Sequence, residues 1–160
     1  MSMRTCGTRR VPWILISIAG VIVTCLGAAL FAFVALFAPL CANEVLQTGL
    51  SPDGRLKAVV FERDCGATTD FSTQVSVLPA GEKLPNDGGN VFTADCDHGA
   101  APSGPGGGPR VDIAWTGARS LIIWHHPKAR FFGAEKRIVV RLGPFETAEV
   151  RVRYSTASGF

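Results

Sequence analysis

Hydrophobic and polar positions divide the chain into two parts of different character. Residues 11–40 are thirty consecutive residues without Asp, Glu, Lys, Arg or His. A bilayer core about 30 Å thick is crossed by about 20 helical residues, so this segment is long enough to span it with some tilt. Pro12 suits the first turn of a helix, and Pro39 suits its exit. The pattern predicts one transmembrane helix over residues 11–40.

A cleaved signal peptide is the competing interpretation of this apolar segment. The apolar region of a signal peptide usually has about 7–15 residues, and this one is roughly twice as long. Leu40 and Cys41, which precede Ala42, do not form a small-x-small cleavage site. Lipoprotein processing at Cys41 would need a small residue before it, and Leu40 is not small. We therefore expect an uncleaved signal-anchor.

After residue 41 the pattern changes to short stretches in which apolar and polar residues alternate. Alternation with a period of two is typical of strands with one buried face. Turn-forming residues separate the stretches, beginning with the Ser-Pro-Asp-Gly run at 51–54. The segment 121–124 is apolar on both faces, so we expect it in the centre of a sheet. The pattern predicts strands over residues 56–63, 73–78, 91–94, 111–115, 121–124, 137–142 and 148–154.

These seven short strands predict a mainly β fold class for residues 41–160. We expect a small antiparallel β-sandwich or open-barrel-like domain, because no soluble helix stands out. Residues 99–109 are almost entirely Gly, Pro, Ala and Ser and are predicted to form a long loop. Only residues 133–137 leave room for a helical turn. Residues 155–160 are expected to form a loose tail.

Charge decides the expected orientation. Arg4, Arg9 and Arg10 precede the apolar segment without an acidic residue among them. The positive-inside rule therefore places residues 1–10 in the cytoplasm and residues 41–160 outside it, in the periplasm if the cell is Gram-negative. The same three arginines account for the whole formal charge of +3, so the outer domain is neutral. A neutral domain outside the cytoplasm gives no reason to expect nucleic acid as a partner.

Cysteines carry the expected covalent chemistry. Cys6 is cytoplasmic in this topology and Cys25 lies in the bilayer, whereas Cys41, Cys65 and Cys96 lie outside, where disulfides persist. Three cysteines allow one disulfide and one leftover residue. We favour Cys41–Cys65, because Cys41 lies at the membrane exit and Cys65 follows the first clear strand; the other two pairings stay open. The bridge would close a loop of about 25 residues and stabilise the fold by about 2–4 kcal/mol. Cys96 would then be a free thiol or form an intermolecular bridge.

A catalytic role for Cys65 is the first chemical hypothesis. His98, His125 or His126 would have to serve as its base. An oxidising compartment favours a structural disulfide instead, and the hydroxyl-rich residues after Cys65 lack a nucleophile elbow. We therefore expect no catalytic residue and no cofactor.

A metal site is the second chemical hypothesis. Asp95, Asp97 and His98 cluster in the sequence, with Cys96 among them. Their spacing matches no known three-ligand pattern, and acidic residues in loops are usually solvated. We expect no metal.

Small residues recur along the apolar segment. Gly20, Thr24 and Ala28 follow one another at intervals of four, which lets two helix backbones approach closely. They are the candidate pairing face for a homodimer formed through the membrane helix. The alternative is the ordinary Gly and Ala content of membrane helices.

A resemblance rests on Cys41 and Asn43 after the apolar segment, the SPDG run at 51–54 and the RDCGATT run at 63–69. This pattern resembles a family of uncharacterised bacterial single-pass membrane proteins, with one more residue here between the Cys and the Asn. The resemblance implies an envelope location and adds weight to the favoured disulfide, because the pattern carries both cysteines. It implies no function, and Cys96 departs from it.

The function expected from the sequence is a membrane-anchored, non-catalytic module that binds a protein, a glycan or another membrane protein. Loops held on a rigid sheet are where recognition usually takes place. One alternative is a small thiol-dependent enzyme or redox factor that uses Cys65 or Cys96. Another is an envelope sensor or an immunity-type protein that acts on a partner through the membrane helix.

Overall fold

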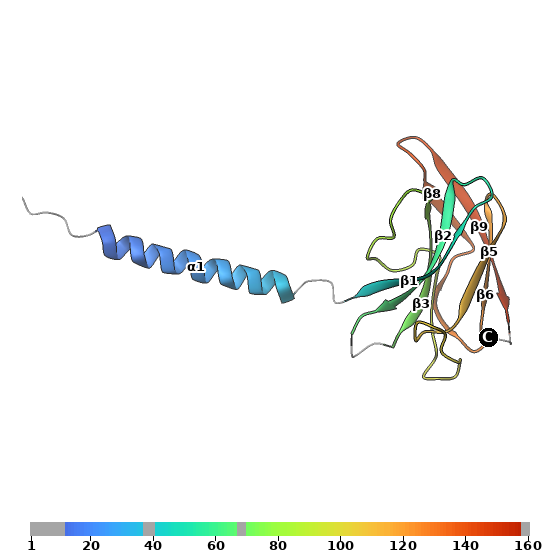
Figure 1. Ribbon diagram of the computed structural model, residues 1–160, viewed down its shortest axis with the longest axis horizontal. Coiled ribbons are helices and arrows are strands. Elements are labelled where there is room, and N and C mark those ends of the chain that lie inside the picture. Colours follow the sequence, from blue (N-terminus) through green and yellow to red (C-terminus); the bar gives the residue numbers. More distant parts are fainter. Residues whose placement is uncertain (1–11, 37–40, 67–69, 158–160) are drawn as a thin grey trace, which may run out of the picture. The chain divides into compact units, whose positions relative to one another are not determined.

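The computed structural model describes residues 12–36, 41–66 and 70–157 (Figure 1). The chain divides into two compact units, Met1–Pro39 and Leu40–Phe160, and each is described by itself. The first unit contains the only helix among the described residues. The described residues of the second unit form strands and loops, and we call this unit the β domain.

The helix of the first unit is α1, Pro12–Leu36. Its segment Leu15–Phe33, 19 residues, is long and apolar enough to cross a membrane. Side chains on all sides of this segment are exposed, as in a helix that faces lipid rather than a protein core. The hydroxyls of Ser17 and Thr24 donate to carbonyl oxygens four residues earlier, so neither depends on water. A membrane anchor and a signal sequence both have a helix of this length and composition near the N-terminus.

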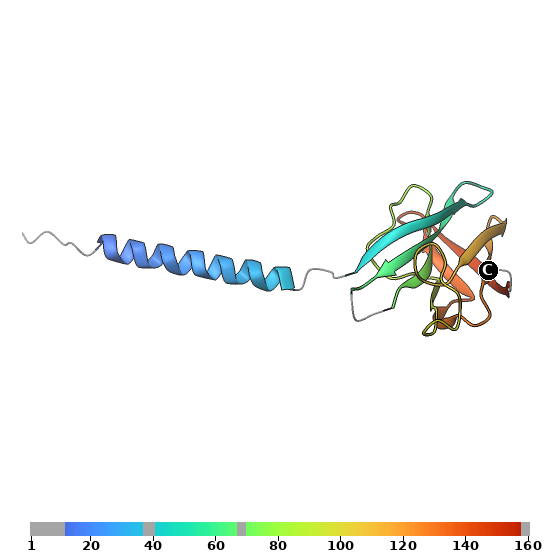
Figure 2. The ribbon, with the colours of Figure 1, turned by 60° about the horizontal axis from the view of Figure 1, so that its bottom comes forward.

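In the part of the β domain that the structure describes, nine strands form two sheets. Figure 2 shows this domain from a second side. The first sheet has five antiparallel strands in the order β1-β2-β3-β4-β7, and the second has four in the order β5-β6-β9-β8. The strands of the first sheet are β1 (Ala42–Leu50), β2 (Leu56–Asp64), β3 (Ser72–Pro79), β4 (Phe92–Asp95) and β7 (Arg130–Ala134). Those of the second are β5 (Val111–Gly117), β6 (Ser120–His125), β8 (Arg137–Arg141) and β9 (Thr147–Thr156).

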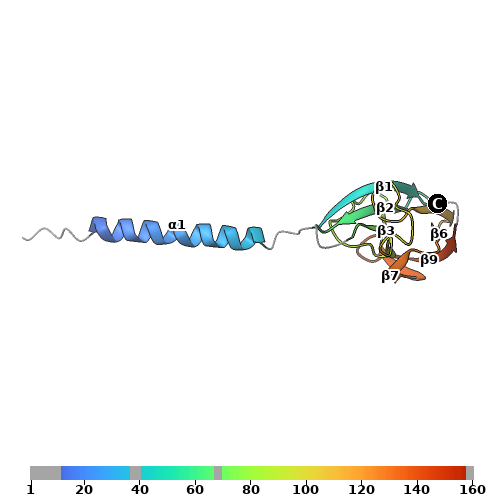
Figure 3. The same cartoon turned by 90° about the horizontal axis from the view of Figure 1, so that it is seen from below.

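The two sheets pack face to face around one hydrophobic core. β5 lies against β1 and β2, and β8 lies against β3; Figure 3 shows β1, β2 and β3 on one side of the β domain and β6 and β9 on the other. Val60 and Val75 from the first sheet meet Ile123 and Val150 from the second, and all four are fully buried. The predicted fold class, mainly β with two layers, is therefore confirmed. β6 also lies between β5 and β9, as the apolar segment 121–124 predicted.

One strand pair is parallel, which the sequence did not predict. β6 and β9 run in the same direction, whereas every other pair of named strands is antiparallel. After β6 the chain crosses to the first sheet to form β7, returns as β8, and turns back as β9. Through this crossover the chain enters β9 at the end of the sheet where it also entered β6, so the two strands are parallel.

Two strands escaped prediction, and both lie at the edges of the first sheet. None of the β1 residues is buried, and its sequence lacks clear alternation of apolar and polar residues. β7 contains Arg130, Phe131, Phe132 and Gly133. Residues 133–137, where the sequence left room for a helical turn, form none, because Ala134 ends β7 and Arg137 begins β8. The predicted tail was also too long, because β9 continues to Thr156 along β6; residues 158–160 lie outside the described residues.

The loop between β3 and β4 folds back over the outer face of the first sheet. Asn43 on β1 donates to the carbonyl oxygens of Pro85 and Asp87. Gly89 lies so close to β3 and β4 that a Cβ there would be 2.8 Å from the carbonyl oxygen of Phe92. Under this loop Phe61 is fully buried although it faces away from the core between the sheets. The loop thus forms a wall on an otherwise open sheet face.

Candidate functional site

The strand register places one polar residue from each strand of the first sheet in a single row. Asn43 on β1 pairs with Arg63 on β2, which pairs with Ser72 on β3. Ser72 in turn pairs with Asp95 on β4, and Asp95 with Arg130 on β7. Paired residues in a sheet point to the same face, and this row points away from the core. Neighbouring strands lie about 4.8 Å apart, so the row extends about 19 Å across the sheet. We call these five residues the polar row.

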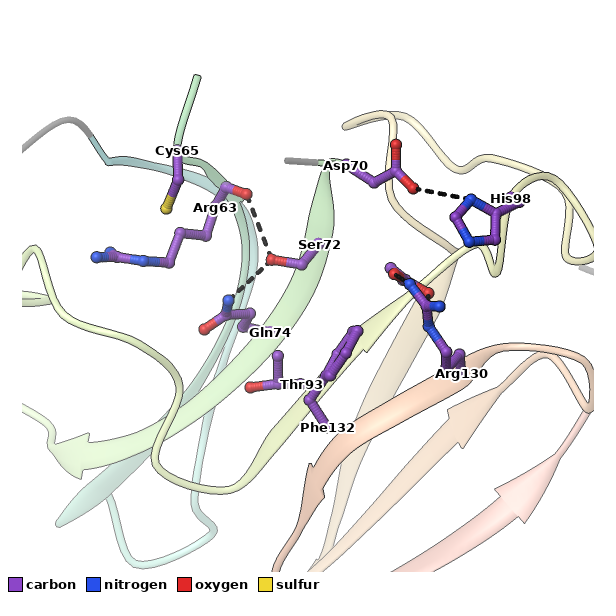
Figure 4. A pocket seen from close by; sticks show the side chains of 10 residues that line it. Arg63, Cys65, Asp70, Ser72, Gln74, Thr93, His98, Arg130 and Phe132 are labelled. Atoms are coloured by element: carbon purple, nitrogen blue, oxygen red, sulfur yellow. Dashed lines mark hydrogen bonds and ion pairs between the residues drawn. The ribbon is translucent and has the colours of Figure 1, made fainter. Parts of the chain in front are cut away.

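A groove follows the polar row over the outer face of β2, β3, β4 and β7. Its volume is about 600 Å³, within the range of about 300–1,000 Å³ that is typical of small-molecule sites. Figure 4 shows its side chains, with Arg63 at one end and Arg130 with His98 at the other. The lining residues are Arg63, Cys65, Asp70, Ser72, Gln74, Thr93, Asp95, His98, Arg130 and Phe132.

The guanidinium of Arg130 contacts two carboxylates and an aromatic ring of the protein. Its guanidinium makes a two-pronged contact with Asp95, with Nε 3.1 Å from Oδ1 and Nη2 bonded to Oδ2. Its Nη1 lies 3.7 Å from Asp97, and its Cζ lies 5.1 Å from the ring centre of Phe132. Burial alone would raise the pKa of Asp95, but the hydrogen bonds from Arg130 and from the Asp97 N–H outweigh it and lower that pKa. This pair therefore holds β4 to β7.

The turn after β4 has an uncommon backbone. Asp97 and His98 both have positive φ, 48° and 54°, and Gly99 follows at 89°. Two consecutive non-glycine residues in this region cost free energy, and such strain concentrates at functional sites. Asp95 stabilises the turn by accepting the N–H of Asp97 at 2.8 Å. The turn directs His98 toward Asp70, with Nδ1 3.8 Å from Oδ2, and both side chains are exposed at the groove.

Arg63, at the opposite end, is held by neutral groups. Its Nη1 donates to Asn43 Oδ1 at 2.7 Å and lies 3.5 Å from Asn86 Oδ1. Asn86 is itself anchored, because its Nδ2 donates to the Cys41 carbonyl oxygen at 2.8 Å. Among the described residues, no carboxylate lies within 4 Å of this guanidinium. Arg63 is thus a positioned cation whose charge the described protein groups do not neutralise.

The floor between the two arginines is polar and preorganised. Ser72 accepts a hydrogen bond from Gln74 Nε2 at 2.8 Å and donates to the Arg63 carbonyl oxygen at 3.3 Å. Gln74 Oε1 accepts the N–H of Gly89 at 2.6 Å, which ties the floor to the covering loop. Thr93 lies beside Gln74 in the next strand. These contacts fix the orientation of the amide and hydroxyl groups before any ligand arrives.

Cys41 and Cys65 form a disulfide, the pairing that the sequence favoured. The bridge ties the start of β1 to the residue after β2, and Cys65 lines the groove. A cysteine in a disulfide has no thiol, so Cys65 cannot act as the nucleophile of a thiol enzyme in this state. That alternative now depends on Cys96, whose Sγ lies 3.6 Å from the Gly107 carbonyl oxygen and 3.7 Å from Ser103 Oγ.

The three histidines do not gather around either cysteine. His125 is buried against Phe131, with ring centres 4.6 Å apart, and its Nδ1 lies 3.0 Å from the carbonyl oxygen of His126. Only His98 shares the groove with Cys65. Within the described ranges, no three His, Cys, Asp or Glu side chains are grouped closely enough to hold a metal ion.

The pairing face predicted on the membrane helix stays a prediction. Gly20, Thr24 and Ala28 all lie within α1 and are exposed along the single chain.

Sequence reasoning considered Cys65, Asp95 and His98 separately, and the groove brings these three together. It did not identify Arg63, Arg130 and Phe132 as residues of a site. None of these residues belongs to a sequence motif that indicates a site, and the sequence did not predict β7 as a strand. The available signal was the alternation of Gln74 and Ser76 with valines on β3, which indicated a polar outer face. Comparisons with protein-family models, curated proteins and solved structures gave no match. The geometry of the site is therefore the basis for its function.

Proposed function

We propose that this protein is a membrane-anchored binding module whose ligand lies in the groove along the polar row. α1 anchors it, with the N-terminus in the cytoplasm and the β domain outside. Two observations support this orientation: the arginines before the apolar segment, and a disulfide of the kind that persists outside the cytoplasm.

The observation that carries the proposal is the polar row itself. Residues from four strands line one groove, and Asn43 on a fifth strand holds Arg63 at its end. Hydrogen bonds within the protein already orient these side chains. Sites built on strands hold their groups more precisely than sites built on loops. Preorganisation of this kind favours binding, because the side chains lose little further freedom when a ligand arrives.

Binding fits the groove better than catalysis. Two of the groups that could transfer protons or attack a substrate are engaged: Asp95 binds Arg130, and Cys65 is in the disulfide. His98 and Asp70 are exposed at the groove and face each other. A nucleophile next to a base, the minimum for covalent catalysis, is absent among the described groove residues. Arg63, Gln74 and Thr93 are recognition groups rather than reactive ones.

Orientation is tested by chemical labelling of spheroplasts that express the full chain. Phe145 is fully exposed in the turn between β8 and β9, so Phe145→Cys in a Cys96→Ser background provides a reporter thiol. A membrane-impermeant maleimide should label this cysteine in intact spheroplasts, and should label Cys6 only after lysis. The reverse pattern would contradict the proposed topology.

Ligand binding is tested by photo-crosslinking in intact cells. Phe132 is 63 % exposed at the groove, so p-benzoylphenylalanine replaces it with little change to the fold. The same replacement at Phe145, which lies in the turn between β8 and β9, is the matched control. Mass spectrometry of the purified protein should find an adduct of defined mass at position 132 and none at 145. Equal adducts at both positions, or none at either, would refute a ligand-binding groove.

A further inference from the structure

We infer that the groove binds a carboxylate-bearing saccharide, with the carboxylate on Arg63 and a sugar face against Phe132. This inference rests on the proposed function and names the class of ligand. It follows from a difference in charge between the two ends of the groove, from the direction of the groove relative to the strands, and from its aromatic rim.

The two arginines of the polar row differ in whether protein groups neutralise their charge. Arg130 faces Asp95 and Asp97, so its charge is neutralised within the protein. Arg63 is bonded through Nη1 to neutral amide oxygens alone, and its Nε and Nη2 make no hydrogen bond to the described residues. A guanidinium edge of this kind matches the two oxygens of a carboxylate, which accepts two parallel hydrogen bonds. Arg63 therefore presents a site for one carboxylate.

The remaining charges of the groove favour a carboxylate over a phosphate. Asp70 and Asp95 line the same groove, and their negative charges oppose a group that carries close to two charges. Phosphate sites are typically made by several basic side chains or by a helix N-terminus. Here a single unneutralised arginine lies among amides and hydroxyls. A singly charged carboxylate on Arg63 fits this balance.

The direction of the groove argues against an extended peptide. β2, β3 and β4 each have a paired strand on both sides, so their backbone N–H and C=O groups are used within the sheet. Peptides that add to a sheet bind along an exposed edge and use main-chain hydrogen bonds. This groove runs across the strands, over about 14 Å from Arg63 to Arg130, and offers side chains only. A ligand here is recognised through its own polar groups by Ser72, Gln74 and Thr93.

A short oligosaccharide has the required combination of groups. Its hydroxyls can exchange hydrogen bonds with the amide of Gln74 and the hydroxyls of Ser72 and Thr93. The apolar C–H face of a sugar ring can pack against Phe132, an exposed aromatic whose ring Arg130 fixes from one side. Amides, hydroxyls, an arginine and an exposed ring around one open groove therefore indicate an acidic saccharide.

The test uses the full-length protein in detergent micelles and isothermal titration. The probes are uronic-acid di- and trisaccharides prepared from pectin, alginate and hyaluronan, each paired with its carboxyl-reduced neutral counterpart. We expect at least one acidic probe to bind, and carboxyl reduction to weaken its binding by about 10- to 100-fold, the effect of losing charged hydrogen bonds.

Variants assign the effect to named residues. Arg63→Gln should remove the preference for the acidic probe, and Arg63→Lys should restore it only partly, because an ammonium cannot bind a carboxylate at two points. Arg153→Gln, an exposed arginine on β9 in the other sheet, is the matched control and should bind as the wild type does. Phe132→Ala should weaken all probes, and Phe145→Ala should weaken none. Because Phe132 is exposed, its removal tests the groove even if Arg63→Gln fails to fold.

Two results would overturn the inference. One is binding of neutral and acidic probes with equal affinity; the other is no binding of any probe. In either case the photo-adduct at position 132 still reports separately on the proposed function. An adduct there whose mass corresponds to a peptide or a lipid would keep the groove as a binding site and reject the saccharide.

Discussion

Two buried carboxylates on opposite faces of the first sheet show different ways of placing a charge out of water. Asp95, 3 % exposed, points outward into the groove and is held by Arg130. Glu62, 8 % exposed, points inward under the Gly-rich loop before β5, and its Oε2 has no hydrogen-bond partner among the described residues. Burial raises the pKa of Glu62, and the nearby Glu44 and Asp64 raise it further, whereas the pKa of Asp95 is lowered.

The difference between the two carboxylates follows from the positions that they occupy on β2 and β4. β2 extends beyond the region where apolar side chains from both sheets meet, so its inward position 62 falls under the loop rather than in the hydrophobic core. Gly106 fits there because it lacks a side chain: a Cβ on it would overlap Glu62 Oε2. Asp95 instead ends β4 opposite Arg130, where a partner is fixed by the register. The strand register thus gives the Asp95 carboxylate a charged partner. The Glu62 carboxylate is buried by a loop that supplies no such partner.

The largest expected effect comes from removing the partner of Asp95. Arg130→Ala should lower the free energy of unfolding by about 2–3 kcal/mol, because it leaves the buried Asp95 carboxylate with the Asp97 N–H but without the two hydrogen bonds from the guanidinium. Arg130 is partly exposed, so the cost stays below that of a fully buried pair. Denaturation of the full chain in micelles, followed by Trp115 and Trp124 fluorescence, measures it. Arg153→Ala is the control and should change stability by less than about 0.5 kcal/mol. Equal stability of both variants would show that the pair contributes nothing.

A smaller effect is expected from filling the space over Glu62. Gly106→Ala would place a Cβ against Oε2 and within 3.0 Å of the Glu62 Cβ, so we expect a loss of about 1–2 kcal/mol. The same change at Gly133, where nothing lies within 4 Å, is the matched control and should be neutral or slightly stabilising. In a Glu62→Ala background the cost of Gly106→Ala should shrink, because the two positions are in contact. An unchanged loss of stability on Gly106→Ala in that background would mean that residue 106 does not contact Glu62.

Replacing the unpartnered charge should stabilise the protein. Glu62→Gln keeps the shape and removes the buried charge, so the free energy of unfolding at pH 7 should rise by about 1 kcal/mol. The same type of change at the other carboxylate, Asp95→Asn, should lower it, because Arg130 then lacks its partner. Denaturation of both variants side by side compares the two carboxylates directly. Destabilisation by Glu62→Gln would indicate that the charge is satisfied in solution.

The smallest effect is a difference in pH dependence. The pKa of Glu62 is raised above its ordinary value of 4.5, so its burial destabilises the fold at neutral pH, and stability should increase as the pH falls from 7 toward 4.5. The pKa of Asp95 is lowered below 3.8, so its contribution is present above that pH and is lost as the pH falls further. The stability of the wild type minus that of Glu62→Gln, measured between pH 7 and 4.5, isolates the first effect. A flat difference would contradict the raised pKa.

Local chemistry accounts for the parts of the structure that the sequence predicted. The helix required only an uninterrupted apolar segment, because the capacity of a helix to cross a membrane depends on its composition and length. Most strands followed from alternation within a few residues, as Val150 and Val152 on β9 illustrate. Position in the chain sufficed to favour Cys41–Cys65. The edge strands β1 and β7 were not predicted, because an edge strand buries few side chains and its sequence therefore alternates only weakly between apolar and polar residues.

The groove could not be predicted in the same way, because it is a property of register. Arg63, Ser72, Asp95 and Arg130 become neighbours only when four strands align at particular positions, and a shift of one residue in any pair would turn a side chain to the opposite face. The bulges in β1 and β7 set that alignment locally. The sequence by itself thus determined an apolar helix and a β domain and favoured the observed disulfide, since each depends on residues close together or on composition. The tertiary structure alone decided which charges are neutralised and which remain open to a ligand, since that depends on contacts across the sheet.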